Sequence, residues 1–268
     1  MSPFQPKRQE SILSQLYQQG HVEVGPLAKG LGVSEATVRR DLRTLAQEGL
    51  LVLTHGGASV SRNPDYSFLS KVARNMEAKR VIGQMAADLV QDGEQIFLDS
   101  GTTCFQMAGF LRAKRGLSVI VNSIRTAQEL LAPGLSVLLL GGQYRPERMD
   151  AVGPMAAASL DQLRGYRAFL GSDGLGIDFG PTATDIDSAS LFGQALKNAR
   201  EAILLVDRTK FDAPALYRIA EWKAISRVVT DARPSQDWTA FLEGAGIQVT
   251  YPEQIDPLSE EPGAKTHA

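Results

Sequence analysis

The sequence predicts an α/β protein made of an N-terminal winged helix-turn-helix followed by a mostly parallel α/β sheet domain. Three observations predict this fold class. A serine-capped, arginine-rich helix precedes a glycine hairpin near the N-terminus, apolar strand-like runs alternate with helical patterns from residue 76 onward, and 268 residues suffice for two domains. With 43% hydrophobic and 22% charged residues, the chain has the composition of a folded globular protein.

Composition also narrows the cellular setting and the chemistry. The single cysteine, Cys104, rules out an internal disulfide framework and fits a reducing compartment. The N-terminus lacks an apolar signal-peptide segment, and no run reaches the roughly 18 apolar residues of a membrane-spanning helix. No cluster of His, Cys and carboxylates has metal-ligand spacing. We therefore expect a cytoplasmic protein with no membrane partner, no metal and no cofactor.

Two helices are predicted at the start of the chain. Apolar residues recur at helical spacing over residues 7–19, which predicts an amphipathic helix ending at Gly20. Pro26 suits the first turn of a second, short helix, and Gly32 suits its end. A short helix, a glycine turn and a further capped helix form the outline of a helix-turn-helix.

The third predicted helix begins after Ser34, which stands at the N-cap position, with Glu35 in the first turn. One narrow sector of its helical wheel is apolar and is expected to pack inside the domain: Val38, Leu42 and Leu45. The opposite sector and its flanks are expected to face outward: Ala36, Thr37, Arg39, Arg40 and Arg43. Arginine binds phosphate or pairs with guanine, and small residues near the helix start allow close approach to base edges. Asp41 lies nearer the packed side, and we expect it to be an internal charge partner.

A β-hairpin is predicted directly after this helix. Gly49 precedes an apolar strand-like run, and Gly56-Gly57 provides the turn, in the position of a wing. His55 is a candidate phosphate contact, with a role in the turn as the alternative. The whole order predicts binding of double-stranded DNA through Ser34, Ala36, Thr37, Arg39, Arg40, Arg43 and His55. The alternative is an ordinary three-helix module with a solvated arginine face.

The remainder of the chain predicts a sheet domain. We divide the chain into a DNA-binding domain at 1–60, a polar linker at 61–75, an α/β domain at 76–255 and a disordered tail at 256–268. Strands are expected at 96–99, 118–123, 136–142, 167–174, 202–207, 227–231 and 247–251. Helices are expected at 77–91, 103–114, 124–132, 153–163, 187–200 and 235–244. Strands that are apolar on both faces and alternate with helices indicate a mostly parallel sheet covered on both sides.

Small, polar or charged residues follow these strands, where open α/β sheets bind their ligands. Gly101-Thr102-Thr103 lies between a strand and a helix, so its amides and hydroxyls can hold an anion at the helix start. Lys210 offers a point charge for a phosphate, and Asp173 can accept hydrogen bonds from sugar hydroxyls. Each feature alone is also typical of a turn or a surface. Their convergence on strand ends predicts a pocket for a polar anion.

The stretch VSEATVRRDLRTLAQEGLLVLTHGGA, residues 33–58, resembles the N-terminal signature of the DeoR family of bacterial transcription regulators, matching at 34, 37–42, 49 and 55–58. The segments FLDSGTT, VNS, LLGGQYR, VGPMA, FLGSDGL and VDRTKF resemble the sensor domain of that family. The resemblance covers about residues 7–250 and implies a domain similar in fold to sugar-phosphate isomerases that binds phosphorylated sugars or related metabolites. It implies effector contacts at Gly101, Thr102, Thr103, Asn122, Ser123, Gly142, Asp173 and Lys210, with Tyr144 and Arg145 as secondary candidates.

Two positions depart from the family pattern. Leu53 stands where the family wing usually carries an arginine, which shifts the expected phosphate contacts to the arginines of the third helix. Ile186 stands where many members carry a glutamate. Either Asp185 or Asp187 takes the place of that glutamate, or the effector differs.

The function expected from the sequence is that of a DNA-binding repressor of sugar or polyol metabolism genes, released from its operator by a phosphorylated sugar. Reading two half-sites requires two copies, so we expect a homodimer or homotetramer. One alternative is a sugar-phosphate isomerase-like enzyme using Asp173, Asp207 and Lys210. Because an N-terminal DNA module has no obvious use in such an enzyme, we expect no enzymatic activity. A further alternative is an interaction module whose glycine-rich loops are only turns.

Overall fold

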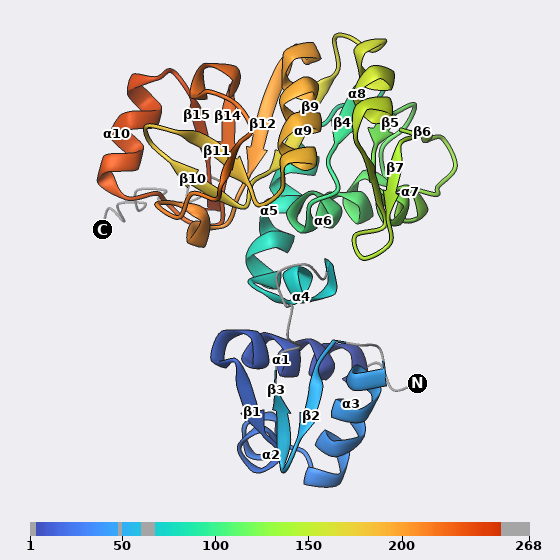
Figure 1. Ribbon diagram of the computed structural model, residues 1–268, viewed down its shortest axis with the longest axis vertical. Coiled ribbons are helices and arrows are strands. Elements are labelled where there is room, and N and C mark those ends of the chain that lie inside the picture. The colour runs from blue at the N-terminus through green and yellow to red at the C-terminus, as the bar shows by residue number, and fades with distance from the viewer. Residues whose placement is uncertain (1–3, 48–49, 60–67, 253–268) are drawn as a thin grey trace, which may run out of the picture.

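The structure, a computed structural model, describes residues 4–47, 50–59 and 68–252, and these residues form two lobes joined through helix α4 (Figure 1). The expected disordered tail at 256–268 lies outside the described residues, as do Gly49 and most of the first half of the expected linker. In the described part of the chain, no helix is long and apolar enough to cross a membrane.

The N-terminal lobe is a winged helix-turn-helix. Its helices are α1 (Phe4–Gln19), α2 (Val24–Leu31) and α3 (Glu35–Gln47). Its antiparallel sheet has the order β1-β3-β2 and contains β1 (His21–Glu23), β3 (Gly57–Ser59) and β2 (Val52–Thr54). Gly32 ends α2 in the left-handed region at a φ of 64°, as glycine does readily. The helices and the hairpin confirm the sequence prediction, whereas the three-residue strand β1 was not predicted.

Buried side chains from all three helices make the core of this lobe. The largest of them are Ile12, Leu16, Leu27, Leu42 and Leu45, each at most 2% exposed. Burial of a Leu or Ile side chain is worth about 1.5–3 kcal/mol, so this cluster fixes the orientation of α3 within the lobe.

The larger lobe is built on a seven-stranded parallel sheet with the order β15-β14-β12-β9-β4-β5-β6. Its strands are β4 (Gln95–Leu98), β5 (Ser118–Val121), β6 (Ser136–Leu139), β9 (Arg167–Gly171), β12 (Glu201–Leu205), β14 (Arg227–Val229) and β15 (Gln248–Thr250). Each coincides with one of the predicted strands, and every neighbouring pair is parallel. The predicted fold class is confirmed.

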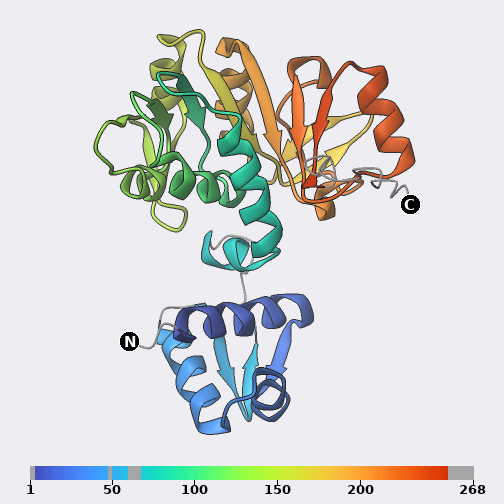
Figure 2. The same cartoon turned by 180° about the vertical axis from the view of Figure 1, so that it is seen from behind.

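Helices cover both faces of this sheet. They are α5 (Met76–Asp88), α6 (Thr102–Leu111), α7 (Ile124–Glu129), α8 (Pro154–Asp161), α9 (Ile186–Asn198) and α10 (Gln236–Gly244). Along β4, Ile96 and Leu98 pack in the cluster with α5 and α6, while Phe97 packs in the cluster with α8, α9 and α10. Helices α8 and α9 cover the face seen in Figure 1, and α5 covers the face seen in Figure 2. Alternate residues thus serve opposite cores.

Short strands and helical turns lie in the loops between these main elements. A two-stranded sheet pairs β7 (Gln143–Arg145) with β8 (Asp150–Val152), and a three-stranded sheet joins β10 (Gly174–Gly176), β11 (Gly180–Ala183) and β13 (Tyr217–Arg218). Two single turns of 3-10 helix are η1 (Arg208–Lys210) and η2 (Trp222–Ala224). Helix α4 (Phe68–Ala73) lies within the range expected to be a polar linker.

Candidate nucleic-acid interface and anion-binding cavity

Helix α3 is capped and oriented by local contacts. The Thr37 amide donates to Ser34 Oγ at 3.2 Å, so Ser34 is the N-cap that the sequence predicted. Asp41, 1% exposed, accepts from Arg8 Nε at 2.5 Å and from Arg8 Nη2 at 3.1 Å. The hydrogen bond to Asp41 raises the pKa of Arg8. Asp41 is therefore the expected internal charge partner, and it ties α3 to α1.

The outward face of α3 consists of Ala36, Thr37, Arg39, Arg40 and Arg43, all exposed except the half-buried Thr37. Arg39 Nη2 lies 2.7 Å from Glu35 Oε2, an exposed pair that costs little to exchange for a phosphate. The guanidinium groups of Arg40 and Arg43 make no hydrogen bond or ion pair with any described residue. Arg40 and Arg43 can accept phosphates or base edges without first breaking an ion pair or hydrogen bond of their guanidinium groups.

The wing is a tight hairpin beside α3. Thr54 pairs with Gly57, which leaves His55 and Gly56 as the two-residue turn, and Gly56 takes a φ of 79°. His55 is exposed at this turn, and Leu53 is 47% exposed on β2. Contacts to DNA from His55, from Ser34 and from the outward face of α3 stay predictions.

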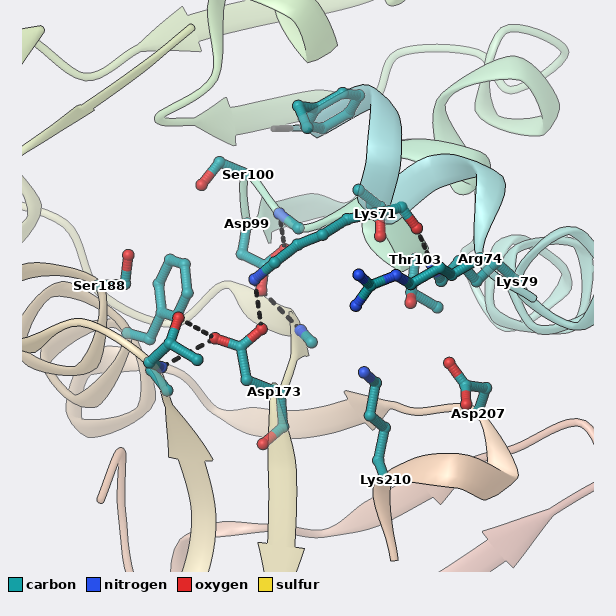
Figure 3. Close-up of a pocket in the computed structure, with 18 of the residues that line it drawn as sticks. Lys71, Arg74, Lys79, Asp99, Ser100, Thr103, Asp173, Ser188, Asp207 and Lys210 are labelled. Atoms are coloured by element: carbon teal, nitrogen blue, oxygen red, sulfur yellow. Dashed lines mark hydrogen bonds and ion pairs between the residues drawn. The ribbon is translucent and has the colours of Figure 1, made fainter. Parts of the chain in front are cut away.

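A cavity of about 350 Å³ opens at the carboxyl ends of β4, β9 and β12 (Figure 3). Loops after these strands line it, together with α4, the start of α5 and the start of α9. The charged or polar lining residues are Lys71, Arg74, Asn75, Lys79, Asp99, Ser100, Thr102, Thr103, Arg148, Ser172, Asp173, Thr184, Ser188, Asp207, Thr209 and Lys210. The predicted residues Gly101, Thr102, Thr103, Asp173 and Lys210 thus come together around one cavity.

The loop after β4 presents backbone donors to this cavity. Asp99, 1% exposed, accepts from the amides of Gly101 and Gly171, each at 2.6 Å, while burial raises its pKa. A Cβ at position 101 would lie 2.8 Å from Asp99 Oδ1, so a larger residue would require the Asp99 carboxylate to shift. Helix α6 starts at Thr102 with no side-chain cap, which leaves its first amides available to an anion.

Cations outnumber carboxylates in the lining. Lys71, Arg74, Lys79, Arg148 and Lys210 face the carboxylates Asp99, Asp173 and Asp207. Desolvation lowers the pKa of Lys79, which is 4% exposed, to about 7. The Lys210 ammonium makes no hydrogen bond or ion pair with any described residue. An anion is the ligand that this excess of positive charge favours.

Two cavity carboxylates are held differently. Burial alone would raise the pKa of Asp173, but the ion pair with Lys71 at 2.7 Å and the hydrogen bonds from Thr184 hold it at about 2. Asp207 is 1% exposed, and its Oδ1 accepts from Asn75 Nδ2 at 3.2 Å and from the Thr209 amide at 3.0 Å. Its Oδ2 is buried without a hydrogen-bond partner among the described residues.

The other predicted effector contacts lie outside the lining. Asn122 and Ser123 are fully buried: Asn122 Nδ2 donates to the Ala151 carbonyl at 3.1 Å, and Ser123 Oγ caps α7. Gly142 and Tyr144 lie on the exposed loop and strand that follow β6. None of these four residues lines the cavity, and their role as effector contacts stays a prediction.

Arg145 also lies outside the lining. Its guanidinium binds the buried Asp150 at 2.7 and 2.8 Å and Asp185 at 2.7 Å. Asp185 also caps α9 and pairs with Arg148, which does line the cavity. Arg145 is thus placed to position Arg148 and Ser188 from behind, and Ile186 beside them is 60% exposed.

The lining residues that sequence reasoning missed include the basic side chains of Lys71, Arg74, Lys79 and Arg148 and the amide of Asn75. Lys71 and Arg74 lie three residues apart in the range expected to be a linker. Lys71 lies on α4, Arg74 in the turn after it and Lys79 on α5, so the only available signal was the frequency of basic residues in this stretch and no single helical pattern.

Two family models match this chain: the DeoR-like helix-turn-helix domain over residues 8–63 and the DeoR C terminal sensor domain over residues 74–232. The chain belongs to the DeoR family of transcription regulators. This confirms the resemblance drawn from the motifs.

Curated relatives agree with the DeoR assignment. The chain is 32% identical over 248 residues to a putative aga operon transcriptional repressor of Escherichia coli O157:H7, covering 91% of this chain and 92% of the relative. It is 37% identical over 213 residues to the lactose phosphotransferase system repressor of Lactococcus lactis subsp. lactis, covering 77% and 83%. Among solved structures, ribose 5-phosphate isomerase A from Methanocaldococcus jannaschii is similar at 19% identity and a TM-score of 0.36, covering 51% and 55%. A likeness at that level does not bear on activity.

Proposed function

We propose that this protein represses genes of sugar or polyol metabolism and leaves its operator when a phosphorylated sugar binds in the cavity. One observation carries the proposal: the chain joins an exposed arginine face on a helix-turn-helix to a cavity in which five cations face three carboxylates. The first group suits a polyanionic duplex and the second suits a small anion with hydroxyl groups. The two relatives named above are repressors, one of the aga operon and one of a lactose phosphotransferase system.

The cavity supports the class of effector. Its volume of about 350 Å³ lies at the lower end of the usual range for small-molecule sites and suits a pentose or hexose phosphate. In this proposal Lys210 and the first amides of α6, which line the cavity, bind the phosphate, and Asp173 and Asp207 face the sugar hydroxyls.

Assembly is part of the proposal. A helix-turn-helix reads one half-site with each copy, so an operator of two half-sites needs two copies of this chain. We expect a homodimer or homotetramer, which light scattering coupled to size-exclusion chromatography measures directly.

Binding and turnover experiments test the function. Duplexes selected by the protein from a randomised pool serve as operator probes in fluorescence anisotropy. Ribose 5-phosphate, fructose 1-phosphate, fructose 6-phosphate and glucose 6-phosphate serve as ligands, with the unphosphorylated sugars as controls. The proposal expects saturable thermal stabilisation by a sugar phosphate and weaker duplex binding in its presence. Turnover of a sugar phosphate would favour the isomerase-like enzyme instead, and no stabilisation by any of them would favour an interaction module.

A further inference from the structure

The segment that joins the two lobes also forms part of the cavity. Helix α4 is seated on the larger lobe by Phe68, which is 6% exposed and meets Phe105 edge to face at 5.4 Å. The Arg125 guanidinium lies 4.5 Å from the centre of the Phe68 ring. On its other side α4 lies next to α1 of the N-terminal lobe (Figures 1 and 2). This one short helix therefore contacts both lobes.

The joining segment consists of α4 and the turn that follows it, residues 68–75. Two of its side chains reach the carboxylates of the cavity. Lys71 Nζ lies 2.7 Å from Asp173 Oδ1 (Figure 3). Asn75 Nδ2 lies 3.2 Å from Asp207 Oδ1. Lys79 donates to the carbonyl of Lys71 from α5. Lys71 and Asp173 are about one fifth exposed, at 21% and 22%, so solvent screens their attraction only in part. The cavity carboxylates thus fasten the joining segment to the sheet.

Both carboxylate oxygens of Asp173 accept hydrogen bonds in this arrangement. Its Oδ1 accepts from Lys71, and its Oδ2 accepts from the amide and the hydroxyl of Thr184, both at 2.9 Å. Asp207 differs, because its buried Oδ2 has no partner among the described residues. A sugar hydroxyl that takes the position of the Lys71 ammonium at Asp173 Oδ1 requires Lys71 to move.

A bound phosphate would attract Lys71 more strongly than Asp173 does. A phosphate monoester carries a charge of about −1.5 to −2 and three acceptor oxygens, against one negative charge on Asp173. Arg74, Lys79 and Lys210 line the same cavity, and the positive charge of Lys71 adds to theirs around any anion bound there. The exchange of Lys71 from carboxylate to phosphate frees Asp173 for a hydroxyl of the same ligand.

We propose that Lys71 is an effector-binding residue, and that a phosphorylated sugar takes Lys71 from Asp173 and so draws α4 onto the cavity. The ligand class is a phosphate monoester of a small polyol or sugar, held by the joining segment as well as by the strand-end loops. This inference rests on the proposed function and adds the route by which the ligand changes the placement of the N-terminal lobe. Occupancy of the cavity is then communicated through α4 and its contact with α1.

Hydrogen exchange over residues 68–75 of the full-length protein tests the first half of this inference. The probe is whichever of ribose 5-phosphate, fructose 1-phosphate, fructose 6-phosphate and glucose 6-phosphate stabilises the wild type most. We expect this probe to slow exchange in wild-type α4. In Lys71→Met, we expect faster exchange without the probe and no slowing with it, while Lys71→Arg retains the wild-type behaviour. Wild-type exchange that is unchanged by a saturating probe would overturn the proposal without any variant.

Duplex binding tests the second half. The response is the ratio of operator dissociation constants with and without the same probe, usually about 5- to 150-fold for coupled sites. Lys71→Met should reduce this ratio by about fivefold or more, whereas the same substitution at the remote, 83% exposed Lys223 should leave it unchanged. A wild-type ratio retained in Lys71→Met overturns the role of Lys71 alone. No response in the wild type overturns the proposed function itself, so the two failures are distinguishable.

Discussion

The positive charges of the two lobes lie in opposite environments. Arg40 and Arg43 are exposed on α3, and their guanidinium groups have no hydrogen-bond or ion-pair partner among the described residues, so water solvates them. In the cavity, Lys79 is 4% exposed, and Lys71 lies 2.7 Å from a carboxylate. Exposed charges bind a polyanion with a strong dependence on salt, because binding releases counterions. Partly dehydrated charges discriminate among small anions, because an anion must compensate for the lost water and, at Lys71, for the lost contact with Asp173.

This contrast explains how one chain can recognise two anions independently. The outward face of α3 gains affinity by adding contacts along a duplex, whereas the cavity gains selectivity from a fixed set of donors and acceptors. Substitutions in one region should therefore leave binding in the other intact. The predictions below start from the largest expected effect.

Leu42→Ala should have the largest effect, because it should destabilise the N-terminal lobe and leave the cavity of the larger lobe intact. Leu42 is 1% exposed in the core beneath α3, and such truncations cost about 2–5 kcal/mol of folding stability. We expect faster hydrogen exchange over residues 35–47 and loss of duplex binding, with stabilisation by a sugar phosphate retained. Arg43→Ala on the exposed side of the same helix is the control and should leave exchange unchanged. Loss of sugar-phosphate binding in Leu42→Ala would show that the lobes do not bind independently.

Lys210→Ala should weaken the cavity for one kind of ligand. The Lys210 ammonium has no protein partner in the described residues, and a hydrogen bond to a charged group contributes about 1.5–3 kcal/mol. Calorimetry should therefore show a loss of more than about tenfold in affinity for a sugar phosphate and a much smaller loss for its unphosphorylated analogue. Equal losses for both would mean that Lys210 does not hold the phosphate. Lys223→Ala provides the control for removal of a lysine elsewhere.

Arg40→Ala should weaken duplex binding by about 1–3 kcal/mol while changing stability by no more than about 0.5 kcal/mol. The reason is that Arg40 is exposed and its guanidinium has no hydrogen-bond or ion-pair partner among the described residues. If Arg40 binds a phosphate, the slope of log affinity against log salt should fall by about one. Anisotropy titrations at several salt concentrations measure both quantities. Unchanged affinity at matched salt would remove α3 from the interface, and Arg112→Ala serves as a distant arginine control.

The main helices and strands could be predicted from the sequence because each depends on a pattern within its own few residues. Apolar runs such as 96–99 and 202–207 predict strands from their own residues alone, and Ser34 predicts the start of the helix that follows it. The short strands β7, β10 and β13 are two or three residues long and carry no repeating pattern, so they escaped prediction. Their formation depends on partners distant in sequence.

The cavity was predicted only in part for the same reason. Gly101 and Lys210 follow strands directly, so their position at the sheet edge could be anticipated. The Lys71–Asp173 pair joins residues 102 positions apart, which no local pattern reveals. Arg145 shows the opposite case: its sequence context suggested an effector contact, but Asp150 and Asp185 occupy its guanidinium. A sequence motif can thus mark Arg145 as a candidate site residue, but only the tertiary structure shows which groups it binds.

The smallest expected effect concerns pH and separates the two regions without mutation. Burial lowers the pKa of Lys79 from 10.5 to about 7, so the folded protein binds fewer protons than the unfolded chain between these values. The contribution of Lys79 to stability therefore rises as pH increases from about 7 towards 10, because the unfolded state then binds more protons. Binding of an anion has the opposite sign, since it favours the protonated form of Lys79.

Affinity for a sugar phosphate should thus fall as pH rises from 7.5 to 9, by up to about tenfold per pH unit. This window lies above the second phosphate pKa of about 6, so the ligand charge stays constant within it. Lys79→Met should flatten the dependence and bind the phosphate more weakly at pH 7. Duplex binding by wild type should change little over the same range, because no buried lysine lies on the outward face of α3. Calorimetry and anisotropy across the window measure the two curves, and a steep fall that persists in Lys79→Met would assign the titration to another group.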